Sequence, residues 1–528
     1  MTTGLGRPER IAGLLLPLFS CPSNQSWGIG EFADVPTLAR WMLRGGLRLL
    51  QLLPLNEMAS GQRSPYSALT TMALDPIFIH VPDVQDFQAI GGEASLDAAM
   101  RGTLEHARAS PGVDYSAVRT LKNRALRAAF RRFLDAEVAA NSDRAATFGA
   151  FVTAQAWWLD DYATFRAIHQ ATGGQSWRHW SSGVRDRDPV ALATITQEIG
   201  HEILFHQYLQ WVAHQQWATA RAEAGGLRIF GDFPFAAAGD SADMWAHQEL
   251  FSFDGTVGAP PDAFSEHGQD WKLPVYDWPA MAAGAYDWFG RRARRASDLF
   301  DGYRVDHVVG LYRTCVFPLD GRPPHFTPAS ESEQAAQGDA VLRAVLDAGG
   351  EVVAEDLGII PPFVRESLGA LQVPGYKVMR WERQWDVQGA PFSDPRHYPA
   401  HSVATSGTHD TDTLATWWSD LGSDQRAAVL AIPSVHERAA QAALSPEESF
   451  VPRVRDALLE ALWASGSDRV VIPAQDLFGW TDRINVPGTV DTLNWTWKLP
   501  WAVDALARQA ECLDRQTTLR GWAHQHRR

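Results

Sequence analysis

The run FDGYRVDH at 300–307 combines a turn-forming Asp-Gly pair with three side chains that can do chemistry, Arg304, Asp306 and His307. Its alternation of apolar and charged residues predicts a strand whose charged side chains share one face. Burying such a cluster costs free energy unless the side chains are paired or a ligand binds there. We therefore predict that Asp306 is a catalytic carboxylate.

Two further carboxylates, Glu355 and Asp410, follow the strand-like runs EVVA and SVATSGTH. Cleaving a glycosidic bond with retention needs one carboxylate that attacks the anomeric carbon and one protonated carboxyl that donates to the leaving oxygen, about 5 to 5.5 Å away. A third carboxylate can hold the sugar hydroxyls. A single acid at a strand end is usually a helix cap or a surface charge. Three of them at the ends of separate strands favour a catalytic site instead.

The elements that must position these acids are eight strand-like stretches separated by helical patterns. They lie at 11–16, 46–53, 227–235, 300–307, 351–357, 375–382, 402–410 and 469–477. Eight strands alternating with helices predict an α/β fold, a (β/α)8 TIM barrel. The carboxyl ends of all barrel strands meet at one face, so acids far apart in the sequence become neighbours there.

The alternation is interrupted between about 85 and 220, where only helices are expected. Apolar residues recur at helical spacing over 120–138 and 198–215. We predict one catalytic barrel over 1–528, with 85–220 as a helical insertion after the second strand. The stretch 319–340 is expected to be a long loop.

The composition is that of an ordinary soluble globular protein, with 45% hydrophobic and 21% charged residues among 528. Its 47 Lys and Arg against 62 Asp and Glu give a net charge of −15. A negative chain without basic blocks argues against nucleic acid and anionic membranes as partners. The 22 tryptophans suit a protein that stacks sugar rings on flat apolar faces.

The cysteines Cys21, Cys315 and Cys512 are few and far apart, so neither a disulfide framework nor a CxxC metal site is available. A reducing, cytoplasmic location is expected. The apolar run at 11–19 is compatible with a secretory leader or a buried strand, and its Pro17 and short length favour the strand. No other segment approaches the ~18 apolar residues that span a bilayer.

Two apparent cofactor motifs fail on their context. GIGEFA at 28–33 matches a permissive dinucleotide pattern, but it does not directly follow a strand. His201 and His206 resemble a zinc-binding helix, but their five-residue spacing puts them on different faces, whereas that motif needs four. No phosphate-binding G-x-x-x-x-G-K-[ST] run is present. We therefore predict no metal and no cofactor.

Several blocks of the sequence resemble the amylomaltase family, the 4-α-glucanotransferases of the α-amylase superfamily, from about residue 11 to 501. In chain order they are LLLPLFS with WGIGEF, QLLPLN with SPYSA, GDFPF with DSADMWA, GAPPDAFSEHGQDWKLPVYDW, FDGYRVDH, VVAEDLG with PGYKVM, SGTHDTDT, and PAQDL with RINVPG and NW. Only the helical insertion lacks such blocks.

This resemblance implies a retaining transferase in which Asp306 is the nucleophile, Glu355 the general acid and base, and Asp410 the group that stabilises the distorted sugar. The region 250–298 is similar to a loop subdomain over the acceptor side. The residues expected to contact glucan are Arg304, His307, His409, Ser64, Tyr66, Asp232, Gln269, Trp271, Asp356 and Asn485. Among them, Tyr66 is expected to be a stacking platform on the donor side, and Trp271 is alternatively a packing residue.

The sequence departs from the family pattern at VVGLYR after His307, at Ala236–Ala238 and at Thr411, where Asn is usual. These departures leave the three acids intact but put the preferred glucan length in doubt. The expected partners are α-1,4-glucan donors and acceptors, and the expected assembly is a monomer or small homo-oligomer. Hydrolysis of α-1,4-glucans by the same acids, or glucan binding without catalysis, are the alternatives.

Overall fold

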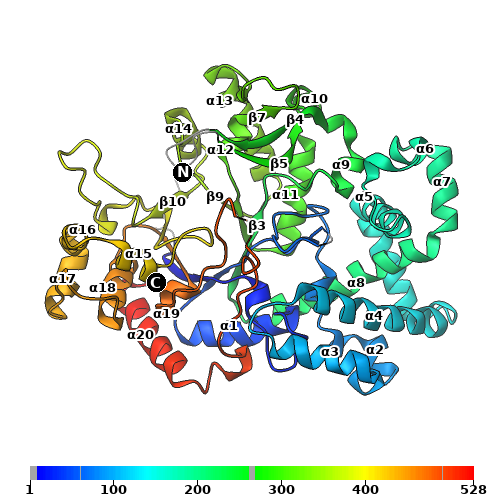
Figure 1. Ribbon diagram of the computed structural model, residues 1–528, viewed down its shortest axis with the longest axis horizontal. Helices are drawn as coiled ribbons and strands as arrows, with labels where there is room; N and C mark the ends of the chain where they lie inside the picture. Colours follow the sequence, from blue (N-terminus) through cyan, green and yellow to red (C-terminus); the bar gives the residue numbers. More distant parts are fainter. Residues whose placement is uncertain (1–8, 60, 261–267, 490) are drawn as a thin grey trace, which may run out of the picture.

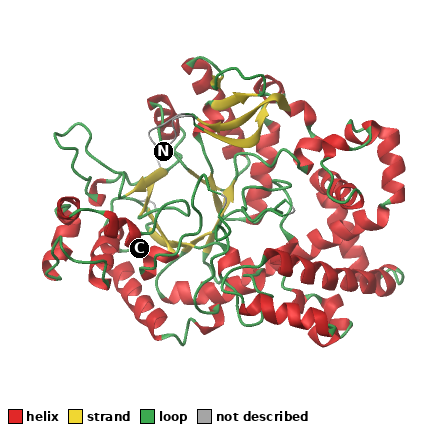
Figure 2. Ribbon diagram, viewed as in Figure 1, coloured by secondary structure: helices red, strands yellow, loops and turns green. Residues whose placement is uncertain are grey.

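Eight parallel strands form a barrel at the centre of the computed structural model, which describes residues 9–59, 61–260, 268–489 and 491–528 (Figures 1 and 2). In barrel order they are β10 (Gly375–Val378), β11 (Ser402–Thr405), β12 (Arg469–Pro473), β1 (Ile11–Leu15), β2 (Leu49–Gln51), β3 (Arg228–Phe233), β6 (Gly302–Val305) and β9 (Glu351–Ala354). Each lies within one of the eight predicted stretches. The (β/α)8 barrel predicted from the sequence is confirmed.

The barrel closes between β9 and β10 without a regular ladder. The backbone N–H of Ala354 donates to the carbonyl of Pro374 at 2.9 Å. The N–H of Tyr376 donates to Oδ1 of Asp356 at 2.7 Å. A side chain and one backbone bond therefore join the two strands where the others pair along their length.

Helices surround the barrel, and the first of them shows how the sequence places them. Helix α1 (Val35–Arg44) carries a proline in its first turn and is followed by Gly45 as its C-cap. It buries Leu38 and Met42 on one face. The helix expected between the first two strand-like stretches is therefore confirmed. The later helices are α9 (Ala242–Ala246), α10 (Trp278–Ala283), α11 (Asp287–Leu299), α12 (Val309–Tyr312), α13 (Glu331–Asp347), α14 (Pro362–Ala370), α15 (Leu414–Asp420), α16 (Ser423–Leu430), α17 (Pro433–Gln441), α18 (Pro452–Trp463), α19 (Ala474–Phe478) and α20 (Ala510–His526).

The region 85–220 consists mainly of helices joined by turns and loops, and it projects from one side of the barrel (Figure 1). It comprises α2 (Gln85–Ala89), α3 (Ala98–Ala109), α4 (Tyr115–Phe133), α5 (Asp143–Ala171), α6 (Ser182–Arg185), α7 (Pro189–Glu198) and α8 (Gly200–Glu223). Aromatic rings from α4, α5 and α8 pack against one another, with Phe133 between Phe148 and Trp211. These apolar contacts give the insertion a core that is continuous with that of the barrel.

A second, antiparallel sheet lies beside the barrel (Figure 2). Its order is β5 (Gln269–Tyr276), β4 (Phe251–Ala259), β7 (Thr314–Pro318) and β8 (His325–Thr327). The prediction of one long loop over 319–340 is wrong, because β8 and the start of α13 occupy part of it. The region 250–298 likewise holds two strands and two helices, and its residues 261–267 lie outside the described part.

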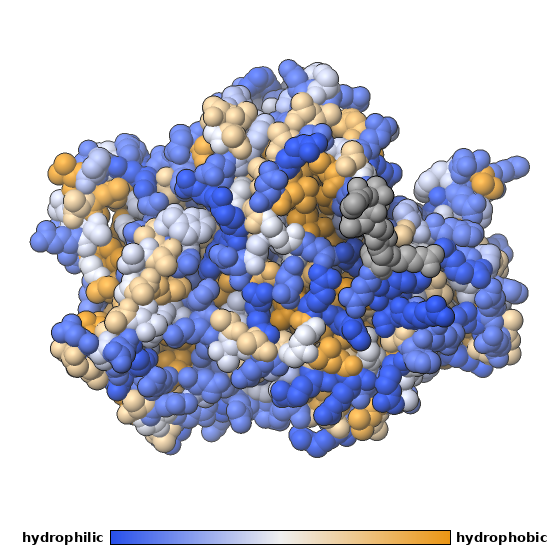
Figure 3. Space-filling model, turned by 180° about the vertical axis from the view of Figure 1, so that it is seen from behind, coloured by the Kyte–Doolittle hydropathy of each residue, from blue (hydrophilic) through white to orange (hydrophobic). Residues whose placement is uncertain are grey.

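Hydrophilic side chains cover much of the face seen in Figure 3, with apolar ones between them. In the part of the chain that the structure describes, no helix is both long enough and apolar enough to cross a membrane. The three cysteines are free and buried. The apolar run after residue 10 forms β1 inside the barrel, as favoured above.

Candidate active site

Asp306 lies immediately after β6, where Arg304 holds it. The register of the sheet places Arg304 beside Asp232 on β3. Nη1 of Arg304 donates to both carboxylate oxygens of Asp232, at 2.8 and 3.0 Å. Its Nη2 lies 2.8 Å from Oδ1 of Asp306. Because the guanidinium is buried and fixed by Asp232, it positions the Asp306 carboxylate rigidly.

Glu355 follows β9, the strand next to β6. Its Oε2 accepts the backbone N–H of His307 at 2.9 Å, and its Oε1 accepts that of Leu357 at 3.2 Å. Burial raises the pKa of Glu355 to about 8; the negative charge of Asp306 adds to the rise, and Arg304 opposes it. A carboxyl with this pKa is protonated at neutral pH, so it can donate a proton.

Asp410 lies after β11, and its pKa is shifted in the opposite direction from that of Glu355. Desolvation by itself would raise the pKa of this carboxyl. A contact with His409 and a hydrogen bond from Asn485 outweigh this effect and lower the pKa to about 2. Nδ2 of Asn485 donates to Oδ1 at 2.6 Å, and Nε2 of His409 lies 3.2 Å from Oδ2. With 42% of its side chain exposed, the ionised Asp410 can accept hydrogen bonds from a ligand.

Tyr66 connects the β2 loop to this site. Its hydroxyl donates to Oδ2 of Asp232 at 2.6 Å and lies 3.2 Å from Nε2 of His409. The two rings are stacked, with centroids 5.5 Å apart. Tyr66 is therefore held in the same network as Arg304, as its predicted place at the site requires.

His307 adopts a left-handed backbone conformation, with φ +48°. This turn ends the strand and directs the N–H toward Glu355. The imidazole lies edge-to-face with Trp271 of β5, with centroids 4.7 Å apart. Burial lowers the pKa of His307 to about 4, against the raising effect of Asp306. The ring is therefore neutral at pH 7 and can both donate and accept a hydrogen bond.

The other residues predicted to contact glucan lie on β5, in the loop after β2 and after β9. Gln269 and Trp271 are on β5, with Trp271 half-buried against His307. The hydroxyl oxygen of Ser64 accepts the N–H of Tyr66 at 3.3 Å and shapes the β2 loop. Asp356 follows Glu355 after β9, and its Oδ1 accepts the backbone N–H of Tyr376 on β10.

Two residues that contact the site, Trp495 and Arg483, were not predicted from the sequence. The ring of Trp495 lies against both Tyr66 and His409, with centroids 5.9 and 5.8 Å apart. Nη2 of Arg483 donates to the carbonyl of Asp410 at 2.8 Å. Both belong to the family-like blocks RINVPG and NW, so position within those blocks was the available signal. Among the described residues, no group of three or more His, Cys, Asp or Glu can hold a metal ion.

A barrel that places a protonated carboxyl beside an ion-paired carboxylate at the carboxyl ends of its strands has the arrangement of enzymes that act on glycosidic bonds. The family model described as 4-alpha-glucanotransferase matches residues 16–504. The 4-alpha-glucanotransferase of Thermus thermophilus is 33% identical over 520 residues, covering 93% of this chain and 95% of that protein. That of Chlamydia pneumoniae is 32% identical over 505 residues, covering 94% and 92%.

The amylomaltase from Streptococcus agalactiae in complex with acarbose has the same fold, with a TM-score of 0.79 at 24% identity, over 98% of this chain and 100% of that one. The chain belongs to the 4-alpha-glucanotransferase family, whose activity is the transfer of glucan segments. The family resemblance, the fold and the enzyme class predicted from the sequence are confirmed.

Proposed function

We propose that this protein moves α-1,4-glucan segments from a donor chain to the 4-hydroxyl of an acceptor glucan by a double displacement that retains configuration. The distances from Arg304 to the carboxyls of Asp306 and Glu355 carry the proposal. Nη2 of Arg304 lies 2.8 Å from Oδ1 of Asp306 and 3.8 Å from Oε2 of Glu355, so these two oxygens are at most about 6.6 Å apart. Carboxyl groups are about 5 to 5.5 Å apart in retaining enzymes and about 6.5 to 9.5 Å in inverting ones, so this upper bound admits the retaining separation and excludes all but the lower edge of the inverting range for this pair of oxygens.

In the first displacement, a carboxylate oxygen of Asp306 attacks the anomeric carbon and forms a glucosyl ester. The bond to the leaving glucan breaks, and its oxygen takes the proton of Glu355. In the second, the Glu355 carboxylate takes the proton of the acceptor 4-hydroxyl, whose oxygen attacks the same carbon. The bond to Asp306 then breaks, and both acids return to their starting states.

The ionised Asp410 and the neutral ring of His307 are the groups proposed to bind hydroxyls of the sugar at the cleavage point. Asp410 accepts hydrogen bonds from hydroxyls as the sugar ring flattens, and its low pKa keeps it ionised throughout the working range. His409, already in contact with Asp410, orients that carboxylate.

Transfer rather than hydrolysis requires that the acceptor site hold a sugar and exclude water. Strand β5 supplies such a site, because Trp271 packs on His307 directly beside the two carboxyls. Gln269 on the same strand is positioned to contact the acceptor. A cytoplasmic location and a monomeric or small homo-oligomeric state remain predictions from the sequence.

Incubation with maltotriose separates the candidate activities. We expect glucose together with a ladder of longer maltodextrins, seen by chromatography. Glucose and maltose alone would show that water is the acceptor. No change would show a binding protein without catalysis. Because no metal is predicted, the product ladder should be undiminished after exhaustive EDTA treatment.

The nucleophile assignment predicts that Asp306→Asn lowers kcat on maltotriose at least about a thousandfold, because the covalent ester no longer forms. Circular dichroism should show an intact fold. Asp320→Asn, which removes a surface carboxylate 57% exposed, is the control and should keep wild-type activity. If Asp306→Asn retains more than about a tenth of the wild-type rate, a loss under ~1.4 kcal/mol of barrier, the assignment fails.

A further inference from the structure

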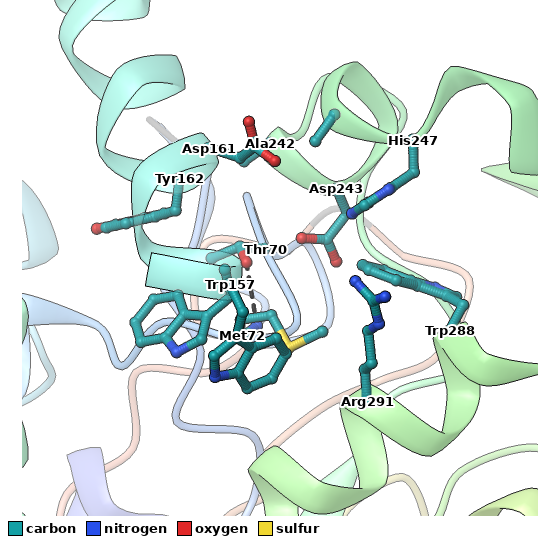
Figure 4. Close-up of a pocket in the computed structure, with 12 residues that line it drawn as sticks. Thr70, Met72, Trp157, Asp161, Tyr162, Ala242, Asp243, His247, Trp288 and Arg291 are labelled. Atoms are coloured by element: carbon teal, nitrogen blue, oxygen red, sulfur yellow. Dashed lines mark hydrogen bonds between the residues drawn. The ribbon is translucent and has the colours of Figure 1, made fainter. Parts of the chain in front are cut away.

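Strands β4 and β5 form an antiparallel pair whose base is packed closely against the rest of the protein. Strand β4 follows α9, and β5 leads into α10 and α11. Figure 4 shows His247, which follows α9, beside Trp288 of α11, and the centroids of the two rings lie 4.6 Å apart. The cavity next to them, about 20 Å³, has room for about one water molecule. Packing therefore fixes the base of the strand pair, whereas Trp271 lies farther along β5.

The ladder between β4 and β5 is interrupted at Trp271. Two residues of β5, 271 and 272, have no partner on β4, although the pairing continues on both sides of them. The flanking pairs are Val257 with Leu273 and Gly258 with Asp270. Residues 271–272 therefore form a bulge in β5. A bulge redirects side chains that would otherwise alternate between the two faces of a sheet, and bulges are frequent next to active sites.

The bulge sets the direction of Trp271. Its ring lies edge-to-face against that of His307, with centroids 4.7 Å apart. The backbone N–H of His307 donates to Oε2 of Glu355 at 2.9 Å, so a single residue separates Trp271 from the proposed general acid and base. A change in the direction of Trp271 would therefore alter the surface beside Glu355 that an acceptor must approach.

Lys272, the second residue of the bulge, has a left-handed backbone conformation with φ +59°. This conformation is disfavoured for a residue with a side chain, and it persists where the surrounding structure enforces it. The side chain of Lys272 is 75% exposed, so its packing does not supply the constraint. Hydrogen bonds to the bulge must supply it instead.

Asp270 accepts these hydrogen bonds. Its Oδ1 accepts the backbone N–H of Lys272 at 2.9 Å and the hydroxyl of Thr256 on β4 at 2.7 Å, and its Oδ2 contacts Nζ of Lys272. One carboxylate thus joins the bulge to the neighbouring strand. Burial would raise the pKa of Asp270, but the hydrogen bonds from Lys272 and Thr256 outweigh this effect and lower the pKa. The carboxylate is therefore ionised at neutral pH, the form that accepts all three contacts.

Gly258 allows the ladder to resume directly at Asp270. A Cβ atom at this position would lie 2.0 Å from the carbonyl oxygen of Gln269 and 2.7 Å from the ring of Phe317. A larger residue would push β5 away from β4 and separate Asp270 from Thr256. Both strands therefore carry residues that permit the short bulge.

We propose that Asp270 is a positioning residue that fixes this bulge, directs Trp271 toward the active site and thereby favours sugar over water as the acceptor. The inference rests on the proposed function, because it concerns how the glucosyl ester on Asp306 is opened. If a sugar hydroxyl attacks, a glycosidic bond forms as the ester bond breaks. If water attacks, its oxygen becomes the anomeric hydroxyl. Glu355 takes the proton in both cases. With the indole displaced, water reaches the anomeric carbon more readily.

Counting reducing ends distinguishes the two acceptors. Transfer forms one glycosidic bond for each bond that it breaks, so the number of reducing ends stays constant, whereas hydrolysis adds one per cleavage. The quantity to measure is therefore the number of new reducing ends per maltotriose consumed. Asp270→Ala should raise this ratio about fivefold, roughly the value of one aromatic contact.

A conservative variant and a matched control accompany Asp270→Ala. Asp270→Asn keeps an oxygen that can accept from Thr256 and Lys272, so its ratio should lie within about twofold of wild type. Asp320→Ala is the control. Asp320 accepts the N–H and Nε of Arg322, two residues further on, in the same way that Asp270 pairs with Lys272, but it follows β7 outside the bulge. Its loss should leave the ratio at the wild-type value.

Two substitutions of Lys272 test the backbone conformation itself. Lys272→Gly keeps the N–H that donates to Asp270 and adopts a positive φ freely, so the ratio should stay within about twofold of wild type. Lys272→Val has a β-branched side chain that disfavours this φ, so the ratio should rise toward that of Asp270→Ala. Because the native side chain is 75% exposed, neither variant disturbs the core. Equal ratios in the two Lys272 variants would overturn the proposal.

A double variant shows whether Asp270 acts through Trp271. Trp271→Ala should raise the ratio by itself, and adding Asp270→Ala should raise it no further. Additive effects, or an unchanged ratio in Asp270→Ala, would refute the positioning role. Circular dichroism of each variant checks that it is folded.

The wild-type protein tests the proposed function separately in the same assay. If its reducing ends increase with every cleavage, it is a hydrolase, and both the proposed function and the role of Asp270 in acceptor choice fail. If the wild type transfers and Asp270→Ala transfers equally well, only the role of Asp270 fails.

Discussion

The carboxyls of Asp306 and Glu355 lie at different distances from the guanidinium of Arg304. Arg304 is in direct contact with Asp306 but 3.8 Å from Glu355, which two backbone N–H groups hold instead. Burial therefore dominates at Glu355 and raises its pKa to about 8. A carboxyl with a raised pKa lowers the free energy of unfolding at every pH at which the same carboxyl is ionised in the unfolded chain.

That cost predicts a pH-dependent gain in stability for Glu355→Gln. Between the ordinary value of 4.5 and about 8, the folded wild type binds more protons at this position than the unfolded chain does. Wild-type stability from this group therefore falls as the pH rises through that window. The neutral glutamine escapes the loss, so its melting temperature relative to wild type should increase from pH 5 to pH 8 and level off above.

Activity measured over the same pH series provides the companion test. The variant should be inactive on maltotriose at every pH, and the kcat/KM of the wild type should fall above about pH 8, where Glu355 loses its proton. A difference in melting temperature that is constant from pH 5 to pH 8 would contradict the raised pKa.

Residue types and their place after strands were sufficient to predict the three carboxylates, which the barrel does bring to one face. The sequence did not predict which neighbours set the protonation of Glu355 and Asp410. Asn485 and Asp410 are far apart in the chain, and only the folded loops bring Nδ2 within 2.6 Å of the carboxylate. The packing of Trp495 against Tyr66 is likewise a product of tertiary packing, which periodicity does not encode.

At the scale of elements, the barrel strands were predictable because each is a short apolar run before a polar turn. The predicted strand at 300–307 extended too far, because Asp306 and His307 continue the alternating pattern while the left-handed backbone of His307 ends the strand. The antiparallel sheet was missed. Its strand β8 has three residues and β4 pairs with register shifts, so neither carries a clear period of two.

An ion cluster at the start of β9 connects three strands of the barrel. Glu351 begins β9 and pairs with Arg228 of β3 and Arg469 of β12, so it connects strands around the amino-terminal mouth of the barrel. Burial, followed by the nearby Arg228, lowers the pKa of Arg469 to about 10. Without Glu351, the guanidinium groups of Arg228 and the largely buried Arg469 would face each other without a carboxylate between them.

Glu351→Gln should therefore destabilise the barrel by about 2 kcal/mol, less than the roughly 3 to 5 kcal/mol for breaking a fully buried pair, because its side chain is 23% exposed. The urea midpoint at pH 7 measures the loss. Asp320→Asn, which breaks an exposed pair with Arg322, is the control and should cost under about 0.5 kcal/mol. Similar losses in the two variants would show that the cluster does not stabilise the barrel.

At the scale of the molecule, the helical insertion is joined to the barrel by buried charges as well as by apolar packing. Nζ of Lys122 on α4 lies 2.5 Å from Oε1 of Glu31, which precedes α1, and donates to the carbonyls of Ile77 and Ile79. His80 contacts the other oxygen of Glu31. All of these side chains are buried, so the contact between the insertion and the barrel depends on their mutual pairing.

Lys122→Met should accordingly lower the free energy of unfolding by about 3 kcal/mol, because it removes the ammonium group beside the buried Glu31 carboxylate, which then keeps His80 and the backbone N–H of Trp27 among its partners. Thermal denaturation and limited proteolysis within 85–220 measure the effect, and adding Glu31→Gln should restore part of the loss. Arg124→Ala, two residues along the same helix, removes an exposed pair with Asp97 and should cost less than about 1 kcal/mol. If the two single variants lose equal stability, or the double variant regains none, apolar packing alone joins the insertion to the barrel. If the prediction holds, the Lys122→Met protein should still disproportionate maltotriose at low temperature, since none of these residues lies in the network around Arg304.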